Sequence, residues 1–348
     1  MSQRSGVGVV ELAILDALDS LGARPGRRLY QCERVLAVVE DSSAVPRGYG
    51  YEVLVDTARD WLTQVPLIDG QGNFGGQGND PPSGPRYTEA RLSPAGQLTL
   101  AAERGELAPV PIGLINGNTH RGGLRPPFRP QGIIDAIRLV LRKPRVSSRE
   151  LLDTIGPPDF ITGCTVTGDM SALYAGQLTE LRLESRVTIT DKVSLPELAG
   201  PRPDAPARNR TVLMIDHFPP YANPDETAQS LAERSEQRSW DDDHPELRRA
   251  TRLQLRNVLD LSTSRDGIQI ACLPAPDADP DQVRDQVRDV YGVWVGVTVR
   301  LRRPLATTVR QWVARNRDEH IVGSLAALEQ AVAAGADVFM NEGATRRI

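Results

Sequence analysis

Hydrophobic positions in the first part of the chain recur with the spacing of amphipathic helices. Residues 8–22, 29–40 and 51–63 each place apolar side chains three or four positions apart, and Gly22 ends the first segment. The stretch 41–50 between the second and third segments is rich in turn-forming residues. Two short helices around such a turn predict a helix-turn-helix, although this pattern alone is weak because most helical hairpins bind no DNA.

Later segments add strands to this helical beginning. Alternating or β-branched runs predict strands within 160–215, at 268–273 and at 292–301. The remaining segments are predicted as helices at 86–107, 132–143, 224–235, 279–290 and 305–336, a mobile insertion at 196–210 and a polar loop at 236–247. Together the elements predict a mixed α/β protein of the α+β class.

One stretch has neither the hydrophobic spacing of a helix nor the alternation of a strand. Residues 69–85 are so rich in glycine and proline that they cannot form a helix, and they predict a loop with unusual backbone angles or a close backbone approach. Gly70, Gly72 and Gly75 have the spacing of a dinucleotide-binding loop. We reject that alternative, because no strand of a βαβ unit leads into the glycines.

Composition narrows the possible classes of protein. The 348 residues are enough for two or three subdomains, and the formal net charge of −4 excludes a uniform polycation. Any nucleic-acid contact would therefore require cations gathered on one face, and arginines do cluster at 121–145 and 300–317. A solvated surface is the equally simple interpretation of those clusters.

The potential metal ligands are scattered. The three cysteines and four histidines form neither a zinc pattern nor a disulfide framework, which favours a reducing cytoplasm. Asp277, Asp279 and Asp281 form an acidic run, but it directly precedes a predicted helix. Helix capping therefore explains the run better than metal binding. The sequence also has no signal-peptide pattern, no apolar run of membrane-spanning length and no P-loop.

The segment Asp69–Pro94, DGQGNFGGQGNDPPSGPRYTEARLSP, resembles the active-site segment of the A subunits of DNA gyrase and topoisomerase IV, whose pattern is close to DGQGNFGSxDGDPPAAxRYTExRL. The resemblance extends over about 10–335 and is dense only around 54–94. Weaker similarities to the same family, in the same order along the chain, lie at 54–70, 133–137, 157–163, 217–223 and 265–270.

This resemblance implies a nucleophile. It assigns Tyr87 the attack on a DNA phosphodiester and Arg86 the stabilisation of the phosphate, to which a guanidinium can bind in a bidentate manner. A phenol, with a pKa of about 10, leaves more readily on religation than an aliphatic alcohol. The residues expected to contact DNA are Arg47, Gln71, Asn73, Arg121, Leu124 and Arg125.

The resemblance also implies an organisation and partners. It divides the chain into a winged-helix-like breakage-reunion domain at 1–108, a tower-like α+β domain at 109–304 and a shortened helical segment at 305–348 that lacks the long coiled coil. The expected partners are double-stranded DNA, a second copy of the chain and a B-type subunit with ATPase and Toprim domains, in an A₂B₂ assembly. Mg²⁺ and ATP are expected on the B-type subunit, and no metal is expected on this chain. A cytoplasmic, nucleoid-associated protein without a membrane segment is expected.

The chain departs from the family pattern at several positions. No histidine precedes His120, so the family's HPHGD motif is missing, and Arg47 supplies a cation in the matching stretch. Arg125, with Leu124 beside it, stands where the family has an isoleucine that wedges between bases. These differences leave two hypotheses open: the DNA-cleaving chain of an ATP-dependent type IIA topoisomerase, or a noncatalytic DNA-binding or gyrase-modulating paralogue.

Overall fold

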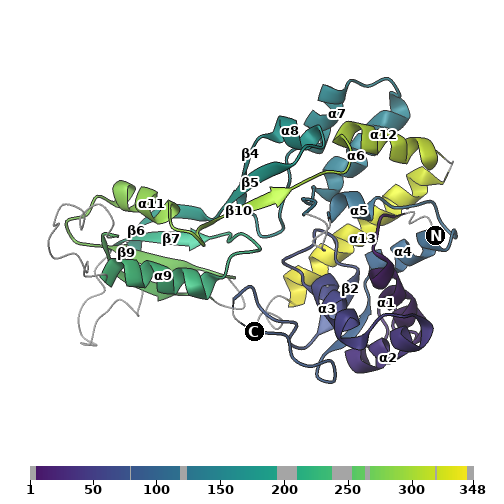
Figure 1. Ribbon diagram of the computed structural model, residues 1–348, viewed down its shortest axis with the longest axis horizontal. Coiled ribbons are helices and arrows are strands. Elements are labelled where there is room, and N and C mark those ends of the chain that lie inside the picture. The colour runs from purple at the N-terminus through teal and green to yellow at the C-terminus, as the bar shows by residue number, and fades with distance from the viewer. Residues whose placement is uncertain are drawn as a thin grey trace.

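The computed structural model describes residues 5–78, 80–117, 124–193, 210–236, 253–262, 267–317 and 320–342. The chain is an elongated α+β protein, and within these residues its strands form three small sheets in which all strand pairs are antiparallel. A helical lobe lies at one end and a sheet-containing lobe at the other, and a narrow three-stranded sheet connects them (Figure 1).

The helical lobe contains the first part of the chain. Ile14, Leu15 and Leu18 lie on the buried face of its first helix, as the spacing of apolar residues predicts. Its sheet has the strand order β1-β3-β2. Its elements are α1 (Val9–Ser20), β1 (Tyr30–Gln31), α2 (Cys32–Ser42), α3 (Arg47–Ala58), β2 (Ile68–Gln71), β3 (Glu89–Leu92) and α4 (Pro94–Glu103).

The prediction of a helix throughout 86–107 is wrong in its first part. Strand β3 pairs with both β1 and β2, and its alternate residues Ala90 and Leu92 are fully buried. The helix begins only at Pro94. Ser93 is its N-cap residue, and the Ser93 side chain accepts a 3.0 Å hydrogen bond from the amide of Gly96. Pairing with two distant strands therefore outweighs the local helical pattern.

The middle of the molecule joins helices to the connecting sheet. Helix α6 buries Ile133, Ile134 and Ile137 on one face, and it packs against α7. The connecting sheet has the order β10-β5-β4, and Trp294 of β10 pairs with Glu184 at the end of β5. The elements here are α5 (Ile112–Ile115), α6 (Pro130–Arg142), α7 (Ser148–Ile155), β4 (Thr165–Gly168), α8 (Met170–Tyr174), β5 (Thr179–Glu184) and β10 (Trp294–Val299).

The far lobe lies in sequence between β5 and β10. Among the described residues it contains a four-stranded sheet of order β6-β7-β9-β8 with the helices α9 and α11, and it has its own hydrophobic core. Figure 1 shows α9 and α11 beside this sheet. Its elements are β6 (Arg186–Val193), β7 (Arg210–Asp216), α9 (Pro224–Glu236), β8 (Leu255–Asp260), β9 (Ile270–Pro274) and α11 (Pro280–Arg288).

The last two helices return to the helical lobe. Helix α12 (Leu305–Arg315) packs on α6, and α13 (Ile321–Glu342) packs on both α4 and α6. Glu329 of α13 accepts two hydrogen bonds of 2.6 Å from the guanidinium of Arg138 on α6. Buried residues of these helices, including Val309 and Leu325, belong to the same core as α1.

Most predicted elements are confirmed with shifted ends. The segment 29–40 becomes helical only at Cys32, because Tyr30–Gln31 pairs with β3, and the helix predicted at 51–63 already ends at Ala58. Helices α7 and α8 and strand β8 were not predicted. The insertion predicted at 196–210 lies outside the described residues except for Arg210, and the loop predicted at 236–247 lies outside them beyond the end of α9. The three-domain division stays a prediction.

Candidate functional site

Tyr87 lies in a turn between the glycine-rich loop and β3, and 69% of its surface is exposed. Its backbone amide donates a 2.9 Å hydrogen bond to the carbonyl oxygen of Gly84, which closes the turn. The exposed aromatic side chain therefore projects from an ordered backbone.

The N-terminus of α2 holds this turn from one side. The amides of Cys32 and Glu33, which have no acceptor inside the helix, donate to the carbonyl oxygens of Thr88 (2.9 Å) and Pro85 (3.0 Å). Gln31 adds a 3.3 Å hydrogen bond from its side-chain amide to the Arg86 carbonyl oxygen. The backbone on both sides of Tyr87 is consequently fixed to the start of one helix.

Helix α3 holds the turn from the other side. The hydroxyl of Tyr51 donates to the carbonyl oxygen of Ser83, and its oxygen lies 3.0 Å from Oγ1 of the fully buried Thr88. Burial raises the pKa of the Tyr51 hydroxyl, so the hydroxyl stays protonated and remains a donor. Burial likewise raises the pKa of the adjacent Cys32 thiol to about 11. A thiol with that pKa is a poor nucleophile, so Cys32 has a structural role in this site.

Two glycines are required by the close approach of backbone to backbone. Gly72 has a φ of +102°, and a Cβ atom there would lie 2.9 Å from the carbonyl oxygen of Tyr87. Gly75 has a φ of +85°, and its Cβ atom would lie 2.9 Å from the carbonyl oxygen of Asp80. The predicted loop with unusual backbone angles is confirmed at these two residues.

The loop between these glycines and Tyr87 is a compact, internally bonded segment. The amide of Ser83 donates to the Asn73 carbonyl oxygen (3.0 Å), and the Asn73 side chain accepts from the amide of Gly75 (2.6 Å). Phe74 is buried against the core of the helical lobe, and Arg59 donates to its carbonyl oxygen at 3.2 Å. Hydrogen bonds and the buried Phe74 ring thus tie the described part of the loop to itself and to the helical lobe.

Three arginines lie on the segments that meet at this turn, one next to Tyr87 and two next to Tyr30 of the paired strand β1. The guanidinium carbon of Arg86 lies 5.5 Å from the centre of the Tyr87 ring. On either side of the neighbouring strand β1, Arg28 and Arg34 lie 4.3 Å and 5.1 Å from the centre of the Tyr30 ring. In the part of the chain that the structure describes, none of these three arginines forms an ion pair with a carboxylate.

This group of arginines was missed in the sequence. The run RRLYQCER places Arg28 and Arg34 on opposite sides of Tyr30 in the chain, and only the β1–β3 pairing brings Tyr30 next to the strand that follows Tyr87. The run itself was the available signal, because arginines flanking a tyrosine are typical of cation–π stacking. Only the long-range strand pairing shows that these arginines lie near the segment that contains Tyr87.

Other predicted site residues lie in different surroundings. Arg47, the first residue of α3, forms an ion pair with Glu40 at 3.2 Å. Gln71 is exposed at the end of β2, where it pairs with Glu89 at the start of β3, close in sequence to Tyr87. The Asn73 side chain forms hydrogen bonds within the loop, to the amide of Gly75 and the carbonyl oxygen of Pro81. Arg121 lies outside the described residues.

Leu124 and Arg125 lie at the connecting sheet. Leu124 bridges Val299, and its carbonyl oxygen accepts a 3.1 Å hydrogen bond from the amide of Arg300. Arg125 is half-buried, and burial together with the nearby charge of Arg302 lowers its pKa. Among the described residues, neither side chain makes a hydrogen bond or ion pair to the Tyr87 loop.

The interpretation of the acidic run as a helix cap is confirmed. Oδ1 of Asp279 accepts a 3.1 Å hydrogen bond from the amide of Asp281 at the start of α11. Over the described ranges, no three His, Cys, Asp or Glu side chains converge in a way that could hold a metal ion. Within the same ranges, no helix combines the length and apolar character needed to cross a membrane.

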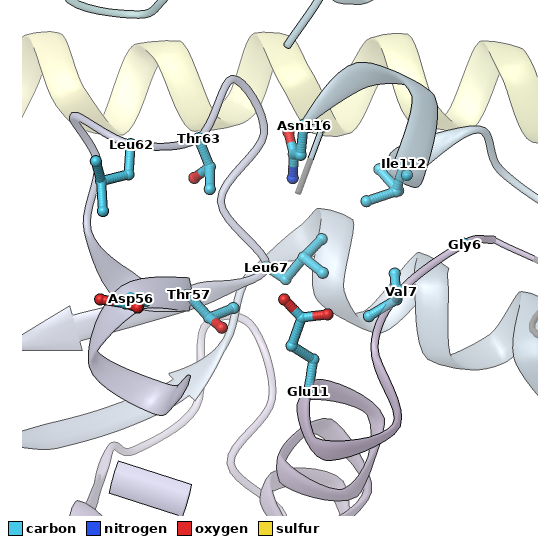
Figure 2. Close-up of a pocket in the computed structure, with 12 residues that line it drawn as sticks. Gly6, Val7, Glu11, Asp56, Thr57, Leu62, Thr63, Leu67, Ile112 and Asn116 are labelled. Carbon is cyan, nitrogen blue, oxygen red and sulfur yellow. The ribbon is translucent and has the colours of Figure 1, made fainter. Parts of the chain in front are cut away.

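The cavity drawn in Figure 2 lies away from this loop, between the start of α1, the end of α3 and α5. Three of its polar side chains, Glu11, Asn116 and Asp56, have partners inside the chain. Glu11 accepts from the amide of Gly8 (2.5 Å), and Asn116 forms two 2.8 Å hydrogen bonds with the backbone of Val65. Asp56 pairs with Arg59 at 3.0 Å. The cavity therefore lies at a junction between elements, with these three side chains used in contacts within the chain.

These features define a class: an α+β protein that presents an exposed tyrosine and an adjacent arginine at the end of an internally hydrogen-bonded glycine-rich loop, with two further arginines flanking the strand that pairs with β3. Residues 50–109 match the family described as the A subunit of DNA gyrase/topoisomerase IV. This matched segment includes most of α3, the glycine-rich loop, Arg86 and Tyr87. The chain is therefore related, over this part of its length, to the A subunits of DNA gyrase and topoisomerase IV.

Individual relatives agree with this result. The chain is 32% identical to the A subunit of DNA gyrase from Synechocystis sp. over 246 residues, which cover 63% of the chain and 27% of the relative. It is 29% identical to the A subunit of DNA gyrase from Streptomyces coelicolor over 258 residues, or 66% and 28% of the two chains. Identity to the A subunit of DNA topoisomerase 4 from Synechocystis sp. is 32% over 199 residues, or 50% and 22%. The chain spans about a quarter of the length of these relatives.

Proposed function

We propose that this chain is a type IIA topoisomerase A-subunit-like protein that cleaves and rejoins double-stranded DNA through Tyr87. The observation that carries the proposal is the state of Tyr87: its side chain is 69% exposed, yet hydrogen bonds from α2 and α3 fix the backbone around it. A nucleophile that must meet a phosphate on a large substrate needs both an accessible hydroxyl and a rigid support.

The proposed reaction is a reversible transesterification. The phenolic oxygen of Tyr87 attacks the phosphorus, a Tyr–O–P bond forms, and the bond from phosphorus to the 3′ oxygen breaks. The phenolic proton is lost and the 3′ oxygen gains a proton, so that the products are a 5′-phosphotyrosyl link and a free 3′-hydroxyl group. Religation reverses each step. Arg86, beside the ring, stabilises the phenolate and the additional negative charge on the phosphate in the transition state.

The surrounding cations support a DNA substrate. Arg28 and Arg34 flank Tyr30, and the strand that contains Tyr30 pairs with β3, which begins two residues after Tyr87. A phosphate backbone next to the cleavage site would supply these arginines with anionic partners. We assign Gln71, at the exposed end of β2, to the same DNA-facing surface.

Further parts of the proposal concern partners. ATP hydrolysis and Mg²⁺, which would neutralise charge on the reacting phosphate, are assigned to a B-type subunit with ATPase and Toprim domains. Cleavage of both strands requires two tyrosines, so we propose a homodimer within an A₂B₂ assembly. In this proposal the helices α1–α3 with their small sheet form the winged-helix-like domain, the later α+β part is tower-like, and the protein acts on DNA in the cytoplasm.

One observation favours a second candidate, a noncatalytic DNA-binding or gyrase-modulating paralogue. The stretch around Arg47 resembles the family segment that has two histidines, but it has none here. Arg47, which could replace their charge, is 3.2 Å from the carboxylate of Glu40. A guanidinium remains protonated near neutral pH and cannot act as a base. In this alternative the chain binds DNA through the same arginines without forming the phosphotyrosyl link.

The test is a covalent-complex assay with the full chain, a B-type subunit, Mg²⁺ and labelled duplex DNA. A denaturant-resistant protein–DNA adduct is expected from the wild-type chain and from Tyr291→Phe, and it should be absent from Tyr87→Phe. Tyr291 is the matched control because it is 67% exposed, almost the same fraction as Tyr87, and lies next to the far lobe. An adduct that persists in Tyr87→Phe refutes the assignment of the nucleophile. DNA binding without any adduct selects the paralogue.

A further inference from the structure

The glycine-rich loop makes a direct contact with the far lobe. The side-chain amide nitrogen of Gln77 donates to two carbonyl oxygens in the turn between β7 and α9, that of Phe218 at 3.3 Å and that of Pro219 at 2.5 Å. Gly78, the next residue, lies against the first turn of α9, since a Cβ atom at Gly78 would be 2.5 Å from Oδ2 of Asp225. One side chain of the loop therefore bridges two lobes of the molecule.

The turn whose carbonyl oxygens accept from Gln77 is well packed and internally hydrogen-bonded. Phe218 is 1% exposed and belongs to the core of the far lobe. The carbonyl oxygen of Pro219 also accepts a 3.0 Å hydrogen bond from the amide of Ala222. His217, just before this turn, has a φ of 54°, a conformation that persists in a non-glycine residue only when its surroundings hold it there. A rotation of the far lobe would therefore move the two acceptor oxygens together.

The loop transmits this contact toward Tyr87 through its own hydrogen bonds. The amide of Gly76, adjacent to Gln77, donates to the carbonyl oxygen of Asp80 at 3.0 Å. Further along, Ser83 donates from its amide to the Asn73 carbonyl oxygen, and its own carbonyl oxygen accepts from Tyr51. Two hydrogen bonds, from Gly76 to Asp80 and from Ser83 to Asn73, thus join the part of the loop next to Gln77 to the part next to Tyr87, with short stretches of backbone between them.

We propose that Gln77 is a positioning residue that makes the order of the Tyr87 loop depend on the orientation of the far lobe. With the lobe in the described orientation, Gln77 is bonded and the loop is held closed. If the lobe turns away, the side-chain amide of Gln77 loses two acceptors and the loop becomes less ordered. The Tyr87 side chain then spends a smaller fraction of the time in a single position. This inference rests on the proposed function for its catalytic consequence, but the contact itself can be tested without catalysis.

Two substitutions of Gln77 distinguish the loss of its hydrogen bonds from repulsion between a new carboxylate and the carbonyl oxygens. Gln77→Met keeps the length of the side chain and removes both hydrogen bonds. Gln77→Glu sets a carboxylate against two carbonyl oxygens and near Asp225. The matched control is Gln64→Glu, because Gln64 also donates from its amide across to the segment before the far lobe, to the carbonyl oxygen (2.7 Å) and Oδ2 (3.1 Å) of Asp159, but lies outside the loop.

The first measurement is hydrogen–deuterium exchange on the full chain without DNA. The peptide covering 72–87 should exchange about tenfold faster in Gln77→Met and faster still in Gln77→Glu, as expected for losing one or two ordinary hydrogen bonds. Peptides from α6 and α13 should be unchanged. Wild-type exchange of the loop in both variants, or equal acceleration by Gln64→Glu, refutes the proposal that Gln77 orders the loop.

The second measurement is cleavage by the complex with a B-type subunit, Mg²⁺ and a nicked duplex. Gln77→Met should lower the maximal rate of adduct formation several-fold and leave the half-saturating DNA concentration unchanged, because the substitution removes no charge. Faster exchange with an unchanged rate refutes the positioning role. If even the wild-type chain forms no adduct, the proposed function fails, and the exchange measurement alone decides whether Gln77 fixes the loop.

Discussion

The hydroxyl oxygen of Tyr51 lies 3.0 Å from Oγ1 of Thr88, and this contact joins α3 to the residue that follows Tyr87. The same hydroxyl donates to the carbonyl oxygen of Ser83 on the other side of the turn. A single phenol thereby spans the two ends of the segment that presents Tyr87. Because Thr88 is fully buried, water cannot replace this partner without opening the lobe.

Tyr51→Phe should therefore loosen the turn as well as destabilise the fold. It leaves the Ser83 carbonyl oxygen without a donor and Oγ1 of Thr88 without its partner, at a cost of about 1–3 kcal/mol in the free energy of unfolding. Limited trypsin digestion should cut faster after the exposed Arg86. The control is Tyr174→Phe, which removes a 2.9 Å hydrogen bond to the Gly156 carbonyl oxygen far from the loop. Equal digestion of the two variants after Arg86 would contradict the role of Tyr51.

Gly72→Ala should disturb the same turn through a clash with its backbone. Its φ of +102° disfavours any side chain, and the new methyl group would press on the Tyr87 carbonyl oxygen at 2.9 Å, so we expect a loss of about 2–4 kcal/mol in urea denaturation. Gly26→Ala is the matched control, since Gly26 has a φ of +70° but an open surrounding, and it should lose only about 1 kcal/mol. A similar loss in both variants would show that backbone angle alone accounts for the effect.

The arginines beside Tyr30 should contribute to the salt dependence of DNA binding. Replacing both Arg28 and Arg34 by alanine should reduce the slope of the logarithm of the binding constant against the logarithm of salt concentration by about two, if each contacts one phosphate. Arg149→Ala is the control, because Arg149 is 93% exposed on α7 and lies away from this cluster. An unchanged slope in the double variant would remove these arginines from the DNA surface.

The contact between α13 and α6 should weaken in acid. The hydrogen bonds from Arg138 hold the pKa of Glu329 below its ordinary value of 4.5. A carboxyl with a lowered folded-state pKa stabilises the fold above the unfolded-state pKa and loses that contribution as the pH falls through the folded-state value. Thermal unfolding between pH 7 and pH 3 should therefore show a loss below about 4.5.

The control for this titration is Glu329→Gln, which removes the ionisable carboxyl but can still contact Arg138. Its melting temperature should lie below that of the wild type near neutral pH, and the two should converge in acid. Glu150→Gln, which removes an exposed 2.9 Å ion pair between α7 and Lys143 at the end of α6, should not reproduce the convergence. Parallel curves for wild type and Glu329→Gln would contradict the stabilising role of this carboxylate.

Some of this structure could be predicted from residues that act locally. The glycines at 72 and 75 predict a loop with unusual backbone angles because only glycine adopts them without strain. The isoleucines of α6 predict its buried face. Asp279 before Pro280 predicts the cap of α11. In each case the physical cause lies within a few residues of its effect.

The remaining features depend on contacts between distant segments. Strand β3 has a locally helical sequence and becomes a strand by pairing with β1 and β2. The side-chain amide of Gln77 reaches carbonyl oxygens some 140 positions away in sequence. The position of Arg28 beside the Tyr87 segment likewise follows from the β1–β3 pairing. No local pattern contains this information, and so these parts of the site were not predicted.

The pairing of Glu184 with Trp294 has a consequence for how the molecule could be built and rearranged. The chain leaves the connecting sheet after Glu184 and re-enters it at Trp294, on an adjacent strand, and the Ser185 amide donates to the Val293 carbonyl oxygen at 2.8 Å. The exit and entry points are thus about 5 Å apart. The far lobe is topologically an insertion into a β-hairpin, so a short turn could close that hairpin in its place. Glu184 and Trp294 are thus the two points at which the backbone of the far lobe joins the connecting sheet.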